Sequence, residues 1–179
     1  MILYLVRHTR VAIPKDLFYG QTDVPLADTF EEESEIVKND LKDIYADAVF
    51  SSPLKRCRKL AEKIVDANNI IFDDRLKELN FGDWEMKSWN ELKGTNIDNW
   101  YNNFVSIKCP NGESFEDLRN RALDFYNDLQ KTNYSNVLIF THSGFIRASI
   151  SILKKINLQD TFKSVIDYGS VMKFDSDKL

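Results

Sequence analysis

The chain has 179 residues, of which 43% are hydrophobic, 12% aromatic and 29% charged, and its net charge is −4. Length and composition are those of an ordinary globular protein, so we expect a single domain over residues 1–179. Nucleic acids and membrane surfaces generally require a basic face, and the acidic balance argues against both as partners. A small molecule is the expected partner, and no feature of the sequence indicates an oligomeric state.

The two cysteines, Cys57 and Cys109, form neither a CxxC pair nor a metal-ligand spacing, which is typical of free thiols in a reducing compartment. Neither is followed six positions later by the arginine that a thiol-dependent phosphatase loop needs. The apolar run at residues 2–6 is too short for a signal peptide, and no segment approaches the ~20 apolar residues of a membrane span. We therefore expect a cytoplasmic protein.

The first half of the chain alternates between predicted strands and helices. Residues 2–6 form a near-continuous apolar run that predicts a buried strand. An acidic helix is predicted from a cap at Thr29 to about Tyr45, followed by a strand at 46–50. Ser51-Ser52-Pro53 predicts the start of a second helix, with a serine cap and proline in the first turn.

The second half continues this alternation after an irregular, aromatic segment at about 75–110, which resembles a lid. Strands and helices in alternation predict a three-layer α/β/α sandwich on a mostly parallel sheet, with ligands beyond the carboxyl ends of the strands. The remaining predicted elements are a helix capped by Ser114 and Asp117, a strand at 137–140, a helix at 145–153, and one or two late strands near 162–166 and 171–174.

Both histidines of the chain, His8 and His142, follow predicted buried strands and fall on this ligand edge. Arg7 precedes the first, and Arg56 lies off the apolar stripe of its helix, from where it can reach the end of the preceding strand. Each residue alone has an ordinary structural interpretation as a core histidine or a surface charge. Together, four potentially cationic groups repel one another unless an anion binds, and phosphate suits the arginine fork.

Four segments resemble, in order, the motifs of the histidine phosphatase superfamily, which includes the phosphoglycerate mutases. The resemblance covers the chain from end to end and implies a phosphoglycerate mutase-like fold and a phosphatase that needs neither a metal ion nor a cofactor. The four segments are Val6–Thr9, Phe50–Cys57, Glu78–Glu85 and Thr141–Gly144.

The resemblance also implies a role for each site residue. His8 would attack phosphorus and become a phosphohistidine, its other ring nitrogen donating to a backbone carbonyl. Glu78 would be the general acid, whereas Glu85 lies outside the reacting centre in the family pattern. The expected catalytic residues are His8, Glu78, Arg7, Arg56 and His142, and the expected phosphate ligands are Arg7, His8, Arg56, His142 and Ser143, with the Gly144 amide.

Two positions depart from the common family pattern, because Thr9 and Met86 stand where many relatives have glycine. The Arg-His-Thr variant, the short chain and the segment 18–26 resemble the α-ribazole phosphatases of cobalamin biosynthesis, which act on α-ribazole 5′-phosphate. The residues expected to face the substrate are Thr9, Tyr19, Gly20 and Gln21. Tyr19, Trp84 and Trp100 either stack on such a base or form the core of the lid, and the second interpretation is favoured.

Several alternatives stay open. A broad-specificity small-molecule or sugar phosphatase and a phosphoglycerate mutase fit the same motifs, although the short segment between the second and fourth motifs favours hydrolysis. A catalytically inactive phosphate-sensing module would be expected to lack His8 or Glu78. A metal-dependent phosphatase would need clustered carboxylates, for which Asp73-Asp74 and Asp175-Ser176-Asp177 are the candidates.

Overall fold

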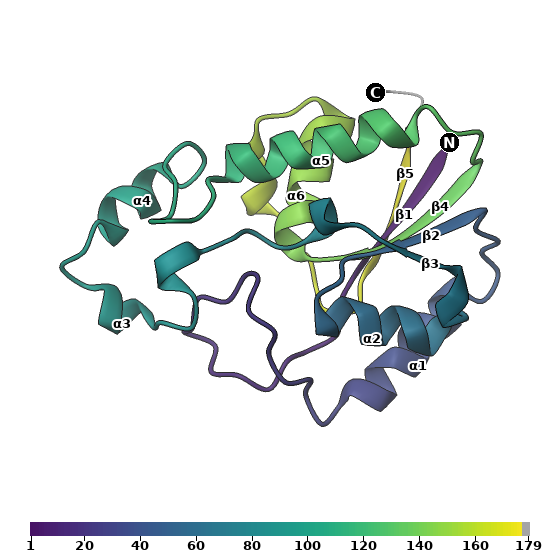
Figure 1. Ribbon diagram of the computed structural model, residues 1–179, viewed down its shortest axis with the longest axis horizontal. Coiled ribbons are helices and arrows are strands. Elements are labelled where there is room, and N and C mark those ends of the chain that lie inside the picture. The colour runs from purple at the N-terminus through teal and green to yellow at the C-terminus, as the bar shows by residue number, and fades with distance from the viewer. Residues whose placement is uncertain (177–179) are drawn as a thin grey trace.

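The computed structural model describes residues 1–176. Within them, one sheet has the strand order β3-β2-β4-β1-β5, with the first four strands parallel and β5 antiparallel to β1 (Figure 1). The mostly parallel sheet predicted from the sequence is confirmed. The strands are β1 (Ile2–Arg7), β2 (Ala48–Ser51), β3 (Ile70–Phe72), β4 (Asn136–Thr141) and β5 (Val171–Asp175).

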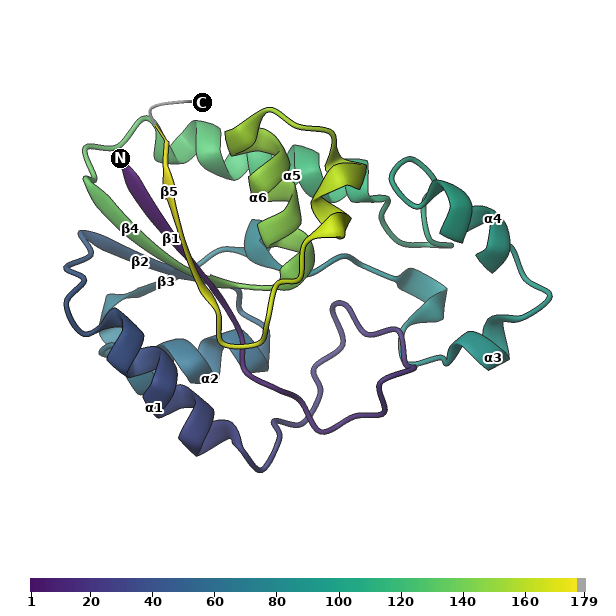
Figure 2. The same ribbon diagram turned by 180° about the vertical axis from the view of Figure 1, so that it is seen from behind.

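Helices cover both faces of this sheet (Figures 1 and 2). Side chains of β4 alternate between the faces, as the period of a strand requires. Val137 and Ile139 pack in the cluster that includes α5 (Phe115–Leu129) and α6 (Ser143–Lys154). Leu138 and Phe140 pack in the cluster that includes α1 (Phe30–Leu41) and α2 (Lys55–Ile64). The three-layer sandwich is therefore confirmed.

The segment at 75–110 extends beyond one end of the sandwich (Figure 1). It contains two short helices, α3 (Trp89–Leu92) and α4 (Ile97–Asn103), and a 3₁₀ turn at Gly82–Trp84. Trp84 and Trp100 are 3% and 7% exposed, with ring centroids 5.5 Å apart. These two rings belong to the core of the excursion, as the favoured interpretation of Trp84 and Trp100 expected.

Two predicted helix ends and one predicted strand differ from the structure. The first helix ends at Leu41 and not near Tyr45. The second begins at Lys55 with Leu54, not a serine, at its cap position, while the Ser52 hydroxyl accepts from the Leu54 amide at 3.3 Å and also lies against His142. The strand predicted at 162–166 is missing, since Leu158–Lys163 forms a 3₁₀ helix whose Phe162 ring packs on Phe115. The capping box of Ser114 and Asp117 is confirmed.

Two further 3₁₀ turns, Ala67–Asn69 and Asp74–Leu76, flank β3, a strand that the sequence analysis did not predict. Over residues 1–176, no helix has the length and apolar content required to cross a membrane.

Candidate active site

The two histidines lie side by side because β1 and β4 are neighbouring parallel strands. The amide of His8 donates to the carbonyl of Thr141 at 3.1 Å, which continues the β1–β4 ladder by one residue. The imidazole centroids of His8 and His142 are 5.2 Å apart, and the residues are 2% and 0% exposed. The predicted meeting of the two strand ends at one sheet edge is therefore present in the fold.

His8 is held in a single tautomer. Its Nδ1 lies 2.7 Å from the carbonyl oxygen of Thr9, and a carbonyl can only accept, so the proton is on Nδ1. Burial, followed by the positive charges of Arg56 and Arg7, holds the pKa of His8 well below 6.5. The ring is thus neutral at pH 7, with the lone pair of Nε2 available for attack on an electrophile.

Arg7 is anchored by backbone and by an aromatic ring. Its Nη1 donates to the carbonyl of Ile166 at 2.6 Å, and its Cζ lies 3.7 Å from the centroid of the Tyr168 ring. Among the described residues, the buried Nε of Arg7 has no hydrogen-bond partner. The protein therefore leaves this N–H donor unsatisfied.

Arg56 is fully buried and spans three partners. Its two terminal nitrogens donate to the carbonyls of Thr22, at 3.1 Å, and Gly20, at 2.5 Å. Its Nε donates to Nδ1 of His142 at 3.2 Å. Within residues 1–176, neither Arg56 nor Arg7 forms an ion pair with a carboxylate. Both arginines therefore keep a net positive charge for an anion.

His142 is neutral as well. Because Nδ1 accepts from Arg56, its proton is on Nε2 and is donated to the Ser52 hydroxyl at 2.8 Å. Burial and the charge of Arg56 hold its pKa well below 6.5. The buried thiol of Cys57 lies 3.4 Å from Nε2, and burial raises the pKa of that thiol. Ser52 and Cys57 lie in the second motif, but nothing in the sequence indicated their contact with His142.

Glu78 lies at the amino terminus of α6. Its carboxylate accepts from the amide of Leu79 at 3.0 Å and from the amide of Gly144 at 3.1 Å, while the Ser143 hydroxyl is 3.4 Å away. A Cβ at position 144 would meet Glu78 Oε1 at 2.0 Å, so only glycine permits this approach. The Gly144 amide, expected to bind phosphate, donates to Glu78 in this structure.

Glu85 organises the loop behind Arg56. It accepts from the amides of Gly20, Gln21, Thr22 and Phe81 and from the Thr22 hydroxyl. Burial opposes ionisation, yet these hydrogen bonds lower the pKa of Glu85 below its usual value. The carboxylate fixes the carbonyls that bind Arg56, which agrees with its expected place outside the reacting centre.

The four residues expected to face the substrate differ in position. Tyr19 lines a pocket of about 270 Å³ that opens beside Arg7, Glu78 and Ser143. Gly20 and Gln21 do not line it, and Thr9 is fully buried with an unpartnered hydroxyl. Arg147 and Tyr168 also line this pocket, and the sequence did not indicate them because they lie outside the four motifs. The other lining residues are Leu17, Phe18, Leu79, Phe81, Phe115, Gly144 and Phe162.

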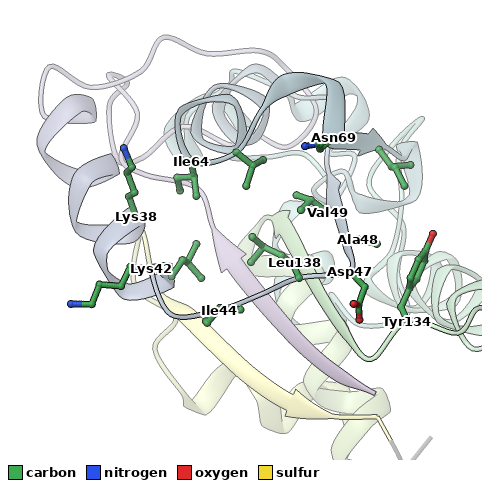
Figure 3. A pocket seen from close by; sticks show the side chains of 14 residues that line it. Lys38, Lys42, Ile44, Asp47, Ala48, Val49, Ile64, Asn69, Tyr134 and Leu138 are labelled. Carbon is green, nitrogen blue, oxygen red and sulfur yellow. The ribbon is translucent and has the colours of Figure 1, made fainter.

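A larger pocket, of about 650 Å³, lies near the amino ends of β2 and β3 (Figure 3). Its walls are mainly aliphatic, as at Val49, Ile64 and Leu138, with Lys38 and Lys42 at the edge. The described lining residues include no histidine and no arginine. The histidines and arginines of the candidate site therefore lie away from this pocket, and His8 and His142 follow the carboxyl ends of β1 and β4.

Two of the acidic residues considered as metal ligands, Asp73 and Asp74, form ion pairs with basic side chains. Asp73 pairs with Arg75 at 2.7 Å, and Asp74 pairs with Lys77 at 2.9 Å. Among residues 1–176, no group of three or more His, Cys, Asp or Glu side chains is arranged to hold a metal ion. Asp177 of the other candidate lies outside the described residues.

The carboxyl ends of the parallel strands carry two neutral histidines, one carboxylate and two arginines that have no acidic partner within residues 1–176. An α/β protein with this site is suited to bind phosphate. Residues 3–178 match the model of the histidine phosphatase superfamily (branch 1), and the chain belongs to this superfamily. Its members are phosphatases and mutases.

Three proteins that are similar to this chain carry the names of three different enzymes. The crystal structure of the α-ribazole phosphatase from Shigella flexneri has a TM-score of 0.87 and 26% identity, covering 98% of this chain and 90% of that one. A Hydrogenobacter thermophilus protein that carries the name of a phosphoserine phosphatase is 29% identical, over 94% of this chain and 86% of its own. Escherichia coli GpmB, which carries the name of a phosphoglycerate mutase, is 30% identical over 93% and 84%.

Proposed function

We propose that this protein hydrolyses phosphomonoesters through a phosphohistidine at His8. The observation that carries the proposal is the fixed tautomer of His8, which leaves Nε2 free beside two arginines. Nε2 attacks phosphorus, the bond from phosphorus to the ester oxygen breaks, and protonated Glu78 gives its proton to the leaving alkoxide. Water then attacks phosphorus and gives a proton to the Glu78 carboxylate, the bond from phosphorus to Nε2 breaks, and inorganic phosphate leaves His8 in its starting state.

During phosphoryl transfer, negative charge is redistributed over the non-bridging oxygens of the phosphate. Arg7 and Arg56 stabilise these oxygens, with the Ser143 hydroxyl as a further donor. His142 joins them in this proposal by turning its Nε2–H from the Ser52 hydroxyl to a phosphate oxygen. The buried and unpartnered Nε of Arg7 supports this role, because it lacks an acceptor until phosphate arrives. No step of this mechanism uses a metal ion, so we expect full activity in excess chelator.

We propose α-ribazole 5′-phosphate as the substrate, in cobalamin biosynthesis. The likeness to the Shigella flexneri enzyme supports this choice, as does the pocket beside Glu78, whose aromatic walls suit a flat base. The aromatic residues that line it are Phe18, Tyr19, Phe81, Phe115, Phe162 and Tyr168.

A second candidate is a phosphoester whose alcohol carries a carboxylate, such as phosphoserine. Arg147 favours it, because this half-buried arginine lines the same pocket. Its Nη1 donates to the carbonyl of Thr161, and its Cζ lies 4.6 Å from the centroid of the Phe162 ring. No ion pair of Arg147 occurs in the part of the chain that the structure describes.

Steady-state kinetics with purified protein tests these proposals. We expect kcat/KM for α-ribazole 5′-phosphate to exceed that for sugar phosphates, phosphoserine and a generic aryl phosphate, with and without chelator. A preference for phosphoserine that is lost in Arg147→Met would instead establish the second candidate. Equal rates on all substrates would indicate a broad-specificity phosphatase, and the absence of turnover would favour a phosphate sensor.

A further inference from the structure

Tyr168 lies over the first phosphate-binding arginine. It belongs to the loop between the 3₁₀ helix Leu158–Lys163 and β5, outside all four motifs. Besides the 3.7 Å contact with Arg7, its ring centroid is 5.6 Å from that of His8. The loop backbone is tied to the same strand end, because the amide of Gly169 donates to the His8 carbonyl and the amide of Arg7 donates to the Ser170 carbonyl.

Tyr19 takes the equivalent place at the second arginine. Its ring centroid is 5.3 Å from the Cζ of Arg56. The hydroxyl oxygens of Tyr19 and Tyr168 are 3.0 Å apart, so one donates to the other. A continuous chain of contacts thus runs from Arg7 through Tyr168 and Tyr19 to Arg56.

We propose that Tyr168 and Tyr19 form a bridge that positions the two arginines for phosphate. This inference rests on phosphate binding at the proposed active site and not on the identity of the leaving group. Tyr168 and Tyr19 are positioning residues, since each acts through the guanidinium beside it.

The geometry of a guanidinium explains how such a bridge works. Its N–H donors lie at the edge of a plane, whereas an aromatic ring contacts its face. Tyr168 therefore fixes the orientation of Arg7 without using the Nε donor, which stays unpartnered. The negative face of each ring also offsets part of the repulsion between two cations in a buried site.

The bridge persists at neutral pH. Burial, and next the hydrogen bond with Tyr168, raises the pKa of Tyr19 above its usual value. Tyr168 and Arg56 contact this phenol, and Arg7 acts on it through its charge. The Tyr19 hydroxyl therefore remains protonated and able to take part in the hydrogen bond.

The test measures the affinity for inorganic phosphate by calorimetry together with kcat and KM for an aryl phosphate. The bridge variants are Tyr168→Leu, which removes the ring from Arg7, and Tyr168→Phe and Tyr19→Phe, which remove only the shared hydrogen bond. The double variant combines the two phenylalanines. Tyr45→Leu is the matched control, because Tyr45 is 90% exposed and lies outside the site.

We expect Tyr168→Leu to weaken phosphate binding by about tenfold and to lower kcat/KM by at least as much. Tyr168→Phe should keep most of the phosphate affinity and most of kcat/KM. The double variant should be no worse than the poorer of the two phenylalanine variants, since each of these three proteins lacks the same single hydrogen bond. Tyr45→Leu should match the wild type. Unchanged phosphate affinity in Tyr168→Leu, or additive losses in the double variant, would overturn the bridge. Wild-type protein that binds phosphate without turnover would refute the proposed hydrolysis and leave the binding test of the bridge in force.

Discussion

At the scale of residues, the site combines permanent positive charge with neutral imidazoles. Arg7 and Arg56 use backbone carbonyls as partners, which satisfies donors without neutralising the guanidinium charge. Burial, and next the same charges, lower the pKa of His8 and of His142. A nucleophile that must be unprotonated is thus kept so by its burial and by the groups that attract its substrate.

This balance predicts how the histidines titrate. In phosphate-free buffer we expect the titration midpoints of both imidazoles to lie well below pH 6.5. The imidazole proton resonances measure these midpoints, and the chain has only two histidines to assign. In urea both should titrate near 6.5. Since the unfolded chain then binds more protons below pH 6.5, the free energy of unfolding should fall as the pH falls through that value. A midpoint at or above 6.5 for folded His8 would contradict its assignment.

Glu78 supports a second prediction at this scale. If it protonates the leaving group, Glu78→Gln should lower kcat by about 10²- to 10⁴-fold for an alkyl phosphate and far less for p-nitrophenyl phosphate, whose leaving group needs no proton. Glu116→Gln, at an exposed position, is the control. Equal losses on both substrates would remove Glu78 from the role of acid.

The positions of the histidines and of Arg56 were predictable because strand ends and the motif order indicate them. Tyr168 was not, since it reaches Arg7 only after β5 pairs with β1 in the fold. The Ser52 hydroxyl, expected only to cap the second helix, accepts from the Leu54 amide and also contacts Nε2 of His142, and the sequence does not reveal that second contact.

At the scale of elements, the departure at Met86 has a measurable cost. Met86 has φ 62°, in the left-handed region that favours glycine, which is the residue expected there from the family pattern. The side chain is 39% exposed, so its removal sacrifices little burial. We therefore expect Met86→Gly to raise the free energy of unfolding by about 1 kcal/mol in urea denaturation.

The control for this prediction is Ile36→Gly, because Ile36 is 58% exposed in α1 and glycine destabilises a helix interior by about 1 kcal/mol. Opposite signs for the two substitutions are expected. A loss of stability in Met86→Gly would show that the side-chain contacts of Met86 outweigh its backbone strain.

At the scale of the whole molecule, the alternation of strands and helices was sufficient to predict the layers and the edge that carries the site. The order of the strands and the pairing of β5 were not predictable, because both depend on contacts between segments distant in sequence. The packing of the loop 20–22 on Glu85, which places two backbone carbonyls around Arg56, was not predictable for the same reason.

The central claim is that His8 carries the phosphoryl group during turnover. Rapid quenching of the wild-type protein with labelled substrate should trap acid-labile, alkali-stable phosphate on the chain, and His8→Ala should trap none. Labelled phosphate that persists on His8→Ala, or turnover at the wild-type rate by that variant, would contradict the account.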